Sequence, residues 1–330
     1  MINTRRYTAS DATLWDAFVR EARNATFLFE RAYMDYHQDR FTDHSLLFYN
    51  EKEVLVALLP ANAVGTSLWS HQGLTYGGFL LSRKATSEEV GQLFSTLVDY
   101  ARQQGFTEIH YKPIPAIYHT LPSEEEEYFL WRLGAQVEVC NLSSTIDLLT
   151  DAQYLKPEYC RRNTYSHLQQ KGFTVDWEAP LSEFWPILTD NLQQRYDAQP
   201  VHSLAEMEQL QRAFPDQILC CIVRNEEGKA LGGTVLFETE RVVHTQYSSA
   251  SPEGKKVGAL DFLYTSLLQV YRLQEGLRYF DFGTSNEDHG RTLNQSLIHY
   301  KESFGGRGVV YKSYLIEVKE VKGDKEVKDK

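Results

Sequence analysis

Cysteine is scarce and unpaired in this sequence. Only four cysteines occur in 330 residues, and none belongs to a Cys-x-x-Cys pair. The adjacent Cys220 and Cys221 would point to opposite faces of a strand. Such a pattern is typical of reduced thiols, so a cytoplasmic location is expected.

Long apolar runs are also lacking. The opening residues MINTRRYTASDATLWDAF contain no apolar stretch of the kind that secretion signals carry. No segment approaches the ~18 uninterrupted apolar residues of a membrane-spanning helix. Neither secretion nor a membrane span is therefore expected.

Basic charge is in deficit, because the formal net charge is −11. The resulting field repels phosphate and so opposes non-specific binding to nucleic acid or to an anionic membrane. DNA is not an expected partner, and the same charge disfavours tRNA.

Several catalytic motifs are missing. The sequence has no G-x-S-x-G, Walker A, H-E-x-x-H or G-x-G-x-x-G pattern, and its ten histidines are scattered. Hydrolase, NTPase, zinc-protease and dinucleotide-binding functions therefore lose their usual support, and no metal is expected.

What the sequence does contain is material for a large core. Hydrophobic residues make up 42% and aromatic residues 13%, against 24% charged. This is a globular composition, and a chain of this length predicts two domains. The end, KEVKGDKEVKDK, has almost nothing to bury and reads as a charged, flexible tail.

The same order of elements occurs twice along the chain. In the first half the predicted strands SLLFYN, VLVALLPANAV and SLWSHQGLTYGGFLL precede a helix from about Ser87 to Gln104, the strand FTEIHYKPI, an acidic helix and the strand AQVEVCNLSSTIDL. In the second half QILCCIVRN, ALGGTVLFET and RVVHTQYSSAS precede a helix from about Ala259 to Gln274, the strand LRYFDFG, another helix and the strand GVVYKSYLIEV.

The two long helices support this repeat independently, because their apolar residues have the same spacing. Each helix is followed by a glycine, Gly105 or Gly276, where a left-handed residue is wanted. The matching positions are Val90, Leu93, Phe94, Leu97, Val98 and Ala101 in the first helix and Leu260, Leu263, Tyr264, Leu267, Leu268 and Tyr271 in the second.

These observations predict an α/β (α+β) chain of two similar halves, each a mixed, mostly antiparallel sheet flanked by helices. The first half is placed at residues 1–150, the second at residues 151–318 and the tail at residues 319–330.

This pattern resembles the GNAT N-acyltransferase fold in two copies, and in particular the Fem-type peptidyltransferases and their relatives with BioF2-like acetyltransferase domains. Three stretches carry the resemblance: LTYGGFLL, CRRNTYSHLQQKGFTV and FDFGTSNEDHGRTLNQSLIHYKESFGGRGVVY. It covers most of the chain, and the last stretch is the most specific of the three. The resemblance implies that the second half, residues 151–318, holds the donor and that the first half, residues 1–150, shapes a cleft for the acceptor.

The resemblance implies that the fourth and fifth strands of the second half part, so that an acyl carrier passes between them. The residues expected to line this wedge are Gln246, Tyr247, Ser248 and Asp281, with Gly283 and Thr284 at the end of the fifth strand. The turn SPEGKKVGAL would receive a pyrophosphate at the start of the long helix, with Gly254, Lys255, Lys256 and Gly258 as its ligands.

At this turn the sequence departs from the family's pattern. GNAT coenzyme A loops usually read Gln or Arg, two residues, Gly, one residue, then Gly or Ala, whereas this chain has Lys255, Gly258 and Leu260. Acyl-CoA, with acetyl-CoA as the first choice, is the expected donor. The departure leaves aminoacyl-tRNA, which Fem-type relatives use, as the alternative donor.

Catalytic roles follow from the chemistry of acyl transfer to an amine. The resemblance places Lys301, in the segment Tyr300-Lys301, near the donor carbonyl, where its charge would stabilise an oxyanion. Asp281, or water near it, is assigned to proton removal, and Tyr247 or Tyr300 to proton donation. The competing interpretation of Lys301 is a lysine whose stem covers apolar surface while its amine reaches solvent.

The acceptor side is expected at two places. Arg161, Arg162 and Asn163, with Lys156 and Lys171 nearby, form the densest basic cluster, which suits phosphate or carboxylate but equally suits a solvated helix face. In SHQGLTYGGFLL the candidates are His71, Tyr76 and Gly77, although turn geometry explains the glycines as well.

Three functions remain open on this evidence. The leading hypothesis is an N-acyltransferase that moves an acyl group from acyl-CoA to a primary amine on a small molecule or a cell-envelope precursor. The nearest competitor is aminoacyl transfer from charged tRNA to a cell-wall precursor. A non-catalytic binding protein with the same fold is the third.

Overall fold

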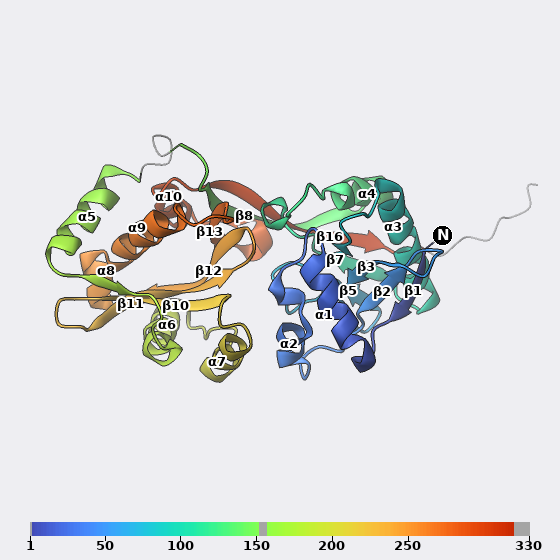
Figure 1. The fold of residues 1–330 in the computed structure, drawn as a ribbon, viewed down its shortest axis with the longest axis horizontal. Helices are drawn as coiled ribbons and strands as arrows, with labels where there is room; N and C mark the ends of the chain where they lie inside the picture. Colours follow the sequence, from blue (N-terminus) through green and yellow to red (C-terminus); the bar gives the residue numbers. More distant parts are fainter. Residues whose placement is uncertain (1, 152–156, 320–330) are drawn as a thin grey trace, which may run out of the picture. The chain divides into compact units, whose positions relative to one another are not determined.

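The computed structural model describes residues 2–151 and 157–319, and the chain divides into two compact units (Figure 1). The first unit contains residues 1–139 and 312–330, and the second contains residues 140–311. The predicted tail and Lys156 lie outside the described residues, apart from the tail's first residue, Lys319. No helix within the described ranges is long and apolar enough to cross a membrane.

The first unit is built from two sheets and the helices that pack on them. One sheet has the order β1 (Asn3–Arg6), β2 (Leu46–Tyr49), β3 (Leu55–Leu59), β6 (Leu80–Leu81), and the other has β4 (Asn62–Val64), β5 (Ser67–Trp69), β7 (Glu108–Tyr111) and the end of β16 (Arg307–Glu317). The helices are α1 (Ala12–Glu21), α2 (Arg31–Met34), α3 (Ser87–Gln103) and α4 (Glu125–Leu133), with 3-10 turns η1 (Ala9–Asp11), η2 (Phe27–Phe29), η3 (Asp35–His37) and η4 (Ala116–Tyr118).

The second unit contains one mixed sheet with helices on both faces (Figure 1). Its strand order is β8 (Gln136–Asp147), β13 (Tyr279–Thr284), β12 (Val242–Ala250), β11 (Ala230–Glu238), β10 (Ile218–Arg224) and β9 (Thr174–Asp176). The pairs are antiparallel except β12 with β13, which is parallel. The predicted mixed, mostly antiparallel class is confirmed.

The helices of the second unit are arranged around this sheet. The helix α9 (Ala259–Tyr271) packs on β10–β12, with α5 (Tyr159–Gln170) against it and α8 (Pro252–Val257) before it. The opposite face carries α6 (Leu181–Tyr196) and α7 (Leu204–Ala213) (Figure 1). The remaining elements are β14 (Asn286–Glu287), η5 (Asp288–Gly290), β15 (Thr292–Leu293) and α10 (Gln295–Glu302).

The two long helices bury the stripes that the sequence predicts. In α3 the stripe faces the core of the first unit, and in α9 the stripe from Leu263 to Tyr271 faces the core of the second. Gly105 and Gly276 both have positive φ, at 81° and 91°. A left-handed backbone suits glycine best, so both residues can turn the chain toward the following strand, as predicted.

Two strands belong partly to each unit. β8 starts in the first unit and continues from residue 140 in the second, whereas β16 starts in the second unit and continues from residue 312 in the first. The two units therefore differ from the expected halves, which divided the chain at residue 150 and assigned all of β16 to the second half.

Candidate functional site

Strands β12 and β13 run side by side only at their beginnings. The last register pair between them is His244 with Asp281. Beyond it β12 continues to Ala250 against β11, while β13 stays with β8. The expected separation of the two strands is present, and it turns one edge of β12 toward a gap.

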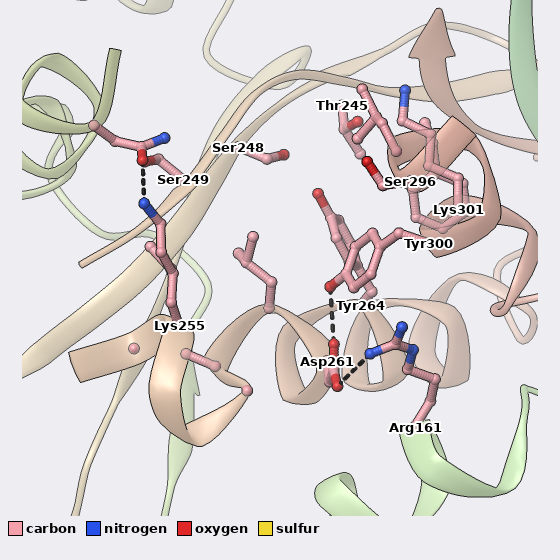
Figure 2. Close-up of a pocket in the computed structure, with 18 of the residues that line it drawn as sticks. Arg161, Thr245, Ser248, Ser249, Lys255, Asp261, Tyr264, Ser296, Tyr300 and Lys301 are labelled. Carbon is pink, nitrogen blue, oxygen red and sulfur yellow. Dashed lines mark hydrogen bonds and ion pairs between the residues drawn. The ribbon is translucent and has the colours of Figure 1, made fainter. Parts of the chain in front are cut away.

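A cavity of about 560 Å³ occupies this gap (Figure 2), which is within the usual range for ligand sites. Side chains from β12, β13, α5, α6, α8, α9 and α10 line it. Its polar lining residues are Arg161, Asn191, Thr245, Ser248, Ser249, Lys255, Asp261, Tyr264, Asn294, Ser296, Tyr300 and Lys301.

Lys301 provides a buried cation at this cavity. It lies in α10, whose N-cap Asn294 accepts a hydrogen bond from the Leu297 N–H at 3.0 Å. The Lys301 side chain is nearly buried, and its Nζ donates to the carbonyl oxygens of Gly283 and Thr284, each at 2.8 Å. Burial lowers the pKa of Lys301 to about 8, although the charge of Asp281 opposes this shift.

Two of the three ammonium protons are therefore used by the backbone. The residue is not a solvent-reaching lysine whose stem merely covers apolar surface, because Lys301 as a whole is only 7% exposed. A third proton remains for an oxygen atom in the cavity.

A hydrogen-bonded triad of Arg161, Asp261 and Tyr300 connects α5, α9 and α10 beside Lys301. The Tyr300 hydroxyl donates to Asp261 Oδ1 at 2.9 Å, and Arg161 Nη1 donates to Asp261 Oδ2 at 2.9 Å (Figure 2). The Arg161 guanidinium also lies over the Tyr300 ring, 4.6 Å from its centre, and its Nε donates to Ser303 Oγ. Burial and the nearby Asp261 raise the pKa of Tyr300 well above its ordinary value, so this hydroxyl stays protonated.

Tyr264 brings a second phenol to the same cavity from α9. Its ring contacts those of Phe282 and Phe304, with centres 5.1 and 5.5 Å away. Burial raises the pKa of Tyr264 to about 12, although a hydrogen bond with Ser248 lowers it slightly. Tyr264 is thus a proton donor, not a base, at neutral pH.

The turn between β12 and α9 has some of the features expected of a phosphate site. Ser251 caps α8 by accepting from the Gly254 N–H at 3.0 Å, and Gly258, with φ of 83°, separates α8 from α9. The start of α9 has no side-chain cap and faces the cavity, as does Lys255, whose amine donates to the Asn191 side chain.

The glycines of this turn also have packing roles. A β-carbon added at Gly254 would lie 2.0 Å from the Leu231 carbonyl oxygen, and one at Gly258 would lie 2.7 Å from Thr164 Cγ2. Close packing alone therefore requires both glycines, whatever binds beside them.

Asp281 does not face the cavity, which changes its expected role. The side chain is fully buried, and its carboxylate accepts hydrogen bonds from Ser143, Thr145, His244 and Tyr311. Alternation along β13 turns Phe280 and Phe282 toward α9, so Asp281 must point to the other face of the sheet. A carboxylate enclosed in this way cannot reach an amine directly.

Tyr247 is likewise turned away from the cavity. A register shift in the pairing of β11 with β12 leaves Gln246 without a partner and reverses the alternation after it. The Tyr247 hydroxyl contacts His202 Nδ1 at 2.6 Å, and its ring contacts Trp185. Neither Gln246 nor Tyr247 lines the cavity, whereas Ser248 does.

Some of the remaining predicted residues take part in the cavity and others do not. Lys256 is exposed and does not line the cavity, and Gly283 and Thr284 contribute through their carbonyl groups on Lys301. Of the basic cluster, Arg161 lines the cavity, whereas Arg162 donates to the Pro157 carbonyl and Asn163 is exposed elsewhere.

The three acceptor residues predicted in the first unit are all buried within it. His71 contacts the rings of His37 and Phe41, and burial lowers the pKa of His71 to about 3. Tyr76 packs on Tyr118, and Gly77 lies against the Ser70 backbone. In this conformation none of the three presents a surface to a ligand.

Sequence reasoning missed several residues of the site. Asp261 is the clearest case, because a carboxylate in the first turn of a helix is ordinarily explained by the helix dipole. Thr245, Tyr264 and Ser296 were missed because their orientation depends on the register shift in β12 and on how α9 and α10 pack.

The site has polar and cationic groups but no metal centre of the usual kind. Within residues 2–151 and 157–319, no group of three or more His, Cys, Asp or Glu side chains could hold a metal ion. The cavity instead offers hydroxyl groups, carbonyl groups and three cations, Arg161, Lys255 and Lys301.

Comparison with known proteins agrees with this geometry. Residues 160–301, which contain every residue that lines the cavity, match the family described as acetyltransferase (GNAT) domain. No curated protein matches the chain.

Solved structures match the chain along its whole length. One is FemX, with a TM-score of 0.68 at 12% identity, covering 96% of this chain and 97% of that one. Another is L-PGS from Bacillus licheniformis, with a TM-score of 0.61 at 14% identity and coverage of 96% and 94%. A third is a tandem GNAT protein from the clavulanic acid biosynthesis pathway, with a TM-score of 0.54 at 12% identity and coverage of 97% and 99%.

At these identities the likeness shows the fold, which is that of two GNAT-like halves in tandem. The family match covers the part of the chain where the strands separate and where Lys301 lies. Residues 160–301 therefore match an acetyltransferase (GNAT) domain, and the chain as a whole has the fold of tandem GNAT-like proteins.

Proposed function

We propose that this protein transfers an acyl group from acyl-CoA, with acetyl-CoA as the first choice, to the primary amine of a small molecule or cell-envelope precursor. The observation that carries the proposal is the gap between β12 and β13, a cavity of about 560 Å³ with the buried ammonium of Lys301 on its wall.

The donor's position follows from the cavity lining. The free edge of β12 beyond His244 offers backbone groups to the amide groups of an extended pantetheine arm. The uncapped start of α9 and the amine of Lys255 favour the pyrophosphate, because both present positive charge on the same side.

Lys301 stabilises the transition state in this account. When the amine nitrogen attacks the thioester carbonyl carbon, negative charge develops on the carbonyl oxygen. The carbonyl groups of Gly283 and Thr284 fix two of the Lys301 protons, so the third is pre-oriented toward that oxygen. Because the ammonium is already held in place, little reorganisation accompanies the reaction.

Tyr264 protonates the departing thiolate in the same account. It lines the cavity and its pKa is raised to about 12, so its hydroxyl is protonated throughout the neutral range. Tyr300 serves instead to hold Asp261, to which its proton is already donated. These roles replace the proton donation first assigned to Tyr247 or Tyr300.

Transfer from charged tRNA is the competing function, and the fold shared with FemX is the reason to test it. A tRNA donor requires an extended basic surface. The cations at this cavity are few, and the chain as a whole carries a net charge of −11. Acyl-CoA is therefore the donor that the site supports better.

The test combines donors with acceptors and follows both products. Acetyl-CoA and a longer acyl-CoA are each incubated with a panel of primary amines, and free thiol and the mass of the acylated amine are measured. A parallel gel-shift titration uses charged tRNA at several salt concentrations. We expect thiol release in equal amount to amide formation, and no tRNA shift even at low salt.

Lys301→Ala provides the internal check, with the exposed Lys84→Ala of the first unit as a matched control. Loss of one oxyanion donor costs about 10²–10³ in kcat, so Lys301→Ala is expected to fall by that factor while Lys84→Ala stays at the wild-type rate. A tRNA shift together with no thiol release from any acyl-CoA would refute the proposed donor.

A further inference from the structure

A buried polar network lies at the point where β12 and β13 separate, on the face of β13 away from α9. At its centre the fully buried Asp281 accepts hydrogen bonds from Ser143 and Thr145 at Oδ1. Its Oδ2 accepts from His244 Nδ1 and from the Tyr311 hydroxyl, each at 2.8 Å. Burial alone would raise the pKa of Asp281, but these hydrogen bonds hold it below its ordinary value, so the group is a carboxylate.

This carboxylate fixes Nδ1 as a protonated nitrogen of the His244 ring. An ionised carboxylate can only accept hydrogen bonds, so the proton between the two groups belongs to His244 Nδ1. The other ring nitrogen, Nε2, is the one left to exchange a proton with a ligand. Among the described side chains of residues 2–151, 157–194 and 197–319, none makes a hydrogen bond to Nε2, and the His244 side chain keeps 15% exposure.

The open edge of the His244 ring lies beside Gly283. A β-carbon added at Gly283 would lie 3.3 Å from His244 Cε1 and 3.9 Å from Nε2. The carbonyl oxygen of the same Gly283 accepts the 2.8 Å hydrogen bond from Lys301 Nζ. The His244 ring and the Lys301 ammonium thus both lie next to Gly283, where the two strands part, with Lys301 on the cavity wall and His244 outside the cavity lining.

We propose that His244, held by Asp281, is the base that takes the proton from the attacking amine. This inference rests on the proposed function, since it adds a base to the same acyl transfer. Asp281 is a positioning residue here, because it acts through His244 and touches neither substrate.

The step balances as follows. The amine nitrogen forms a bond to the thioester carbonyl carbon and passes one proton to His244 Nε2, while Lys301 stabilises the oxyanion. Collapse of the tetrahedral intermediate breaks the carbon–sulfur bond, and the departing sulfur takes a proton from Tyr264. The proton on His244 then returns to Tyr264 through solvent, which restores both groups and leaves an amide and free coenzyme A.

A purely structural role would explain part of this network but not its open side. Ser143, Thr145 and Tyr311 already give Asp281 three hydrogen bonds, which is ample satisfaction for a buried carboxylate. The imidazole adds a fourth and turns an unoccupied nitrogen toward Gly283. Removing the His244 imidazole and then adding free imidazole separates a structural role from a role as a base.

The experiment compares His244→Ala and His244→Gln with wild type, using acetyl-CoA and the panel of primary amines. Acetyl-CoA binding is measured by calorimetry and folding by thermal melting, and kcat is measured with and without added imidazole. His167→Ala, in the exposed part of α5, is the matched control. Asp281→Asn tests the positioning residue.

Loss of a general base costs about 10²–10⁴ in rate, so kcat of both His244 variants is expected to fall in this range with acetyl-CoA binding unchanged. Imidazole is expected to restore His244→Ala in proportion to its concentration, and not to restore Asp281→Asn or alter His167→Ala. If His244→Ala does not fold, the folded His244→Gln variant decides on kcat alone.

Two failures can be told apart. A wild-type protein that binds no acyl-CoA and acylates no amine refutes the proposed function, and the role of His244 with it. A wild-type protein that turns over, with a His244→Gln rate within about twofold of it or no imidazole rescue in a folded His244→Ala, overturns only the role of His244.

Discussion

Lys301 keeps its charge in a nearly buried position because two backbone carbonyl groups accept its protons. Its pKa of about 8 predicts that the oxyanion-stabilising charge is complete below that pH and is lost as pH rises above it. In Lys301→Arg this charge should remain above pH 8, because the pKa of a guanidinium is above about 12. The rate of this variant should therefore not fall above pH 8, even if its highest rate is below that of the wild type.

The measurement is the ratio of kcat/KM for wild type to that for Lys301→Arg between pH 6 and 9.5. The ratio removes the ionisation of the acceptor amine, which is common to both proteins. It should decline through pH 8. A ratio that stays constant across this range would show that the charge of Lys301 does not contribute to the rate.

Glu126 gives a second prediction for a single residue, in the core of the first unit. It is nearly fully buried, and its Oε1 accepts from the Phe79 N–H and the Tyr111 hydroxyl. Burial raises the pKa of Glu126 to about 8. The folded state therefore keeps a proton that the unfolded state releases near pH 4.5, and this contribution to stability is complete at low pH and lost as pH rises toward 8.

Glu126→Gln keeps the accepting oxygen and removes the ionisation. Urea unfolding of both proteins should show the wild type losing stability relative to the variant between pH 5.5 and 8, by up to about 1.4 kcal/mol per pH unit. Parallel stability curves for the two proteins would mean that Glu126 is ionised in the folded state.

For single residues, the sequence predicted the type of environment better than the contacts that each side chain makes. The position of Lys301 beside an apolar stripe could be inferred, and alternation correctly turned Asp281 away from its aromatic neighbours. The burial of Asp281 and its contacts with Ser143 and Thr145 could not, because those partners are more than 130 residues away in the chain. The ion pair between Asp261 and Arg161 could not be predicted for the same reason, because the two residues are 100 positions apart in the chain.

The short helix α8 shows how a single element positions the site. It connects β12 to α9, and Gly254 lets it approach β11 so closely that an added β-carbon would lie 2.0 Å from the Leu231 carbonyl oxygen. Since backbone atoms cannot move aside cheaply, Gly254→Ala should cost about 2–4 kcal/mol of stability and weaken acetyl-CoA binding through the displaced Lys255.

Gly228→Ala is the matched control, because Gly228 has a φ of 81° but no atom within 4 Å of an added β-carbon. It should cost about 1 kcal/mol and leave binding unchanged. Thermal melting and calorimetry on both variants check this. Equal losses of binding in the two variants would show that α8 does not help to position the donor.

Elements were predicted well where local patterns decide them. The stripes of α3 and α9 and the positive φ of Gly105 and Gly276 follow from spacing and from the properties of glycine. The register shift beside Gln246 was not predictable, because it depends on pairing between β11 and β12 and leaves no mark on either strand alone. That shift explains why Tyr247 was assigned to the wrong face.

At the scale of the whole molecule, the halves of the sequence are not the units of the structure. β8 pairs with β13 through Asp147, Ile146 and Thr145, which all precede the expected boundary at residue 150. Periodicity locates repeated elements, but it cannot reveal that a strand at the end of one repeat completes the sheet of the next.

The pairing of β8 with β13 predicts how a fragment of the chain behaves. A fragment of residues 151–330 lacks β8, which would expose the edge of β13 and leave Asp281 without Ser143 and Thr145. It should be aggregated or unfolded by circular dichroism and thermal melting, whereas the full chain melts cooperatively. A cooperative melt of the 151–330 fragment would contradict the role given to β8.

The central claim is that an acyl-CoA occupies the gap between β12 and β13, and calorimetry with acetyl-CoA on a plugged variant tests it most directly. Ser296→Trp places a bulky ring at the cavity, and Ser166→Trp places the same ring on the exposed surface of α5. The account predicts one-site binding to wild type and Ser166→Trp, with affinity at least about tenfold weaker for Ser296→Trp. Equal affinity in all three proteins, or no binding to any, would contradict it.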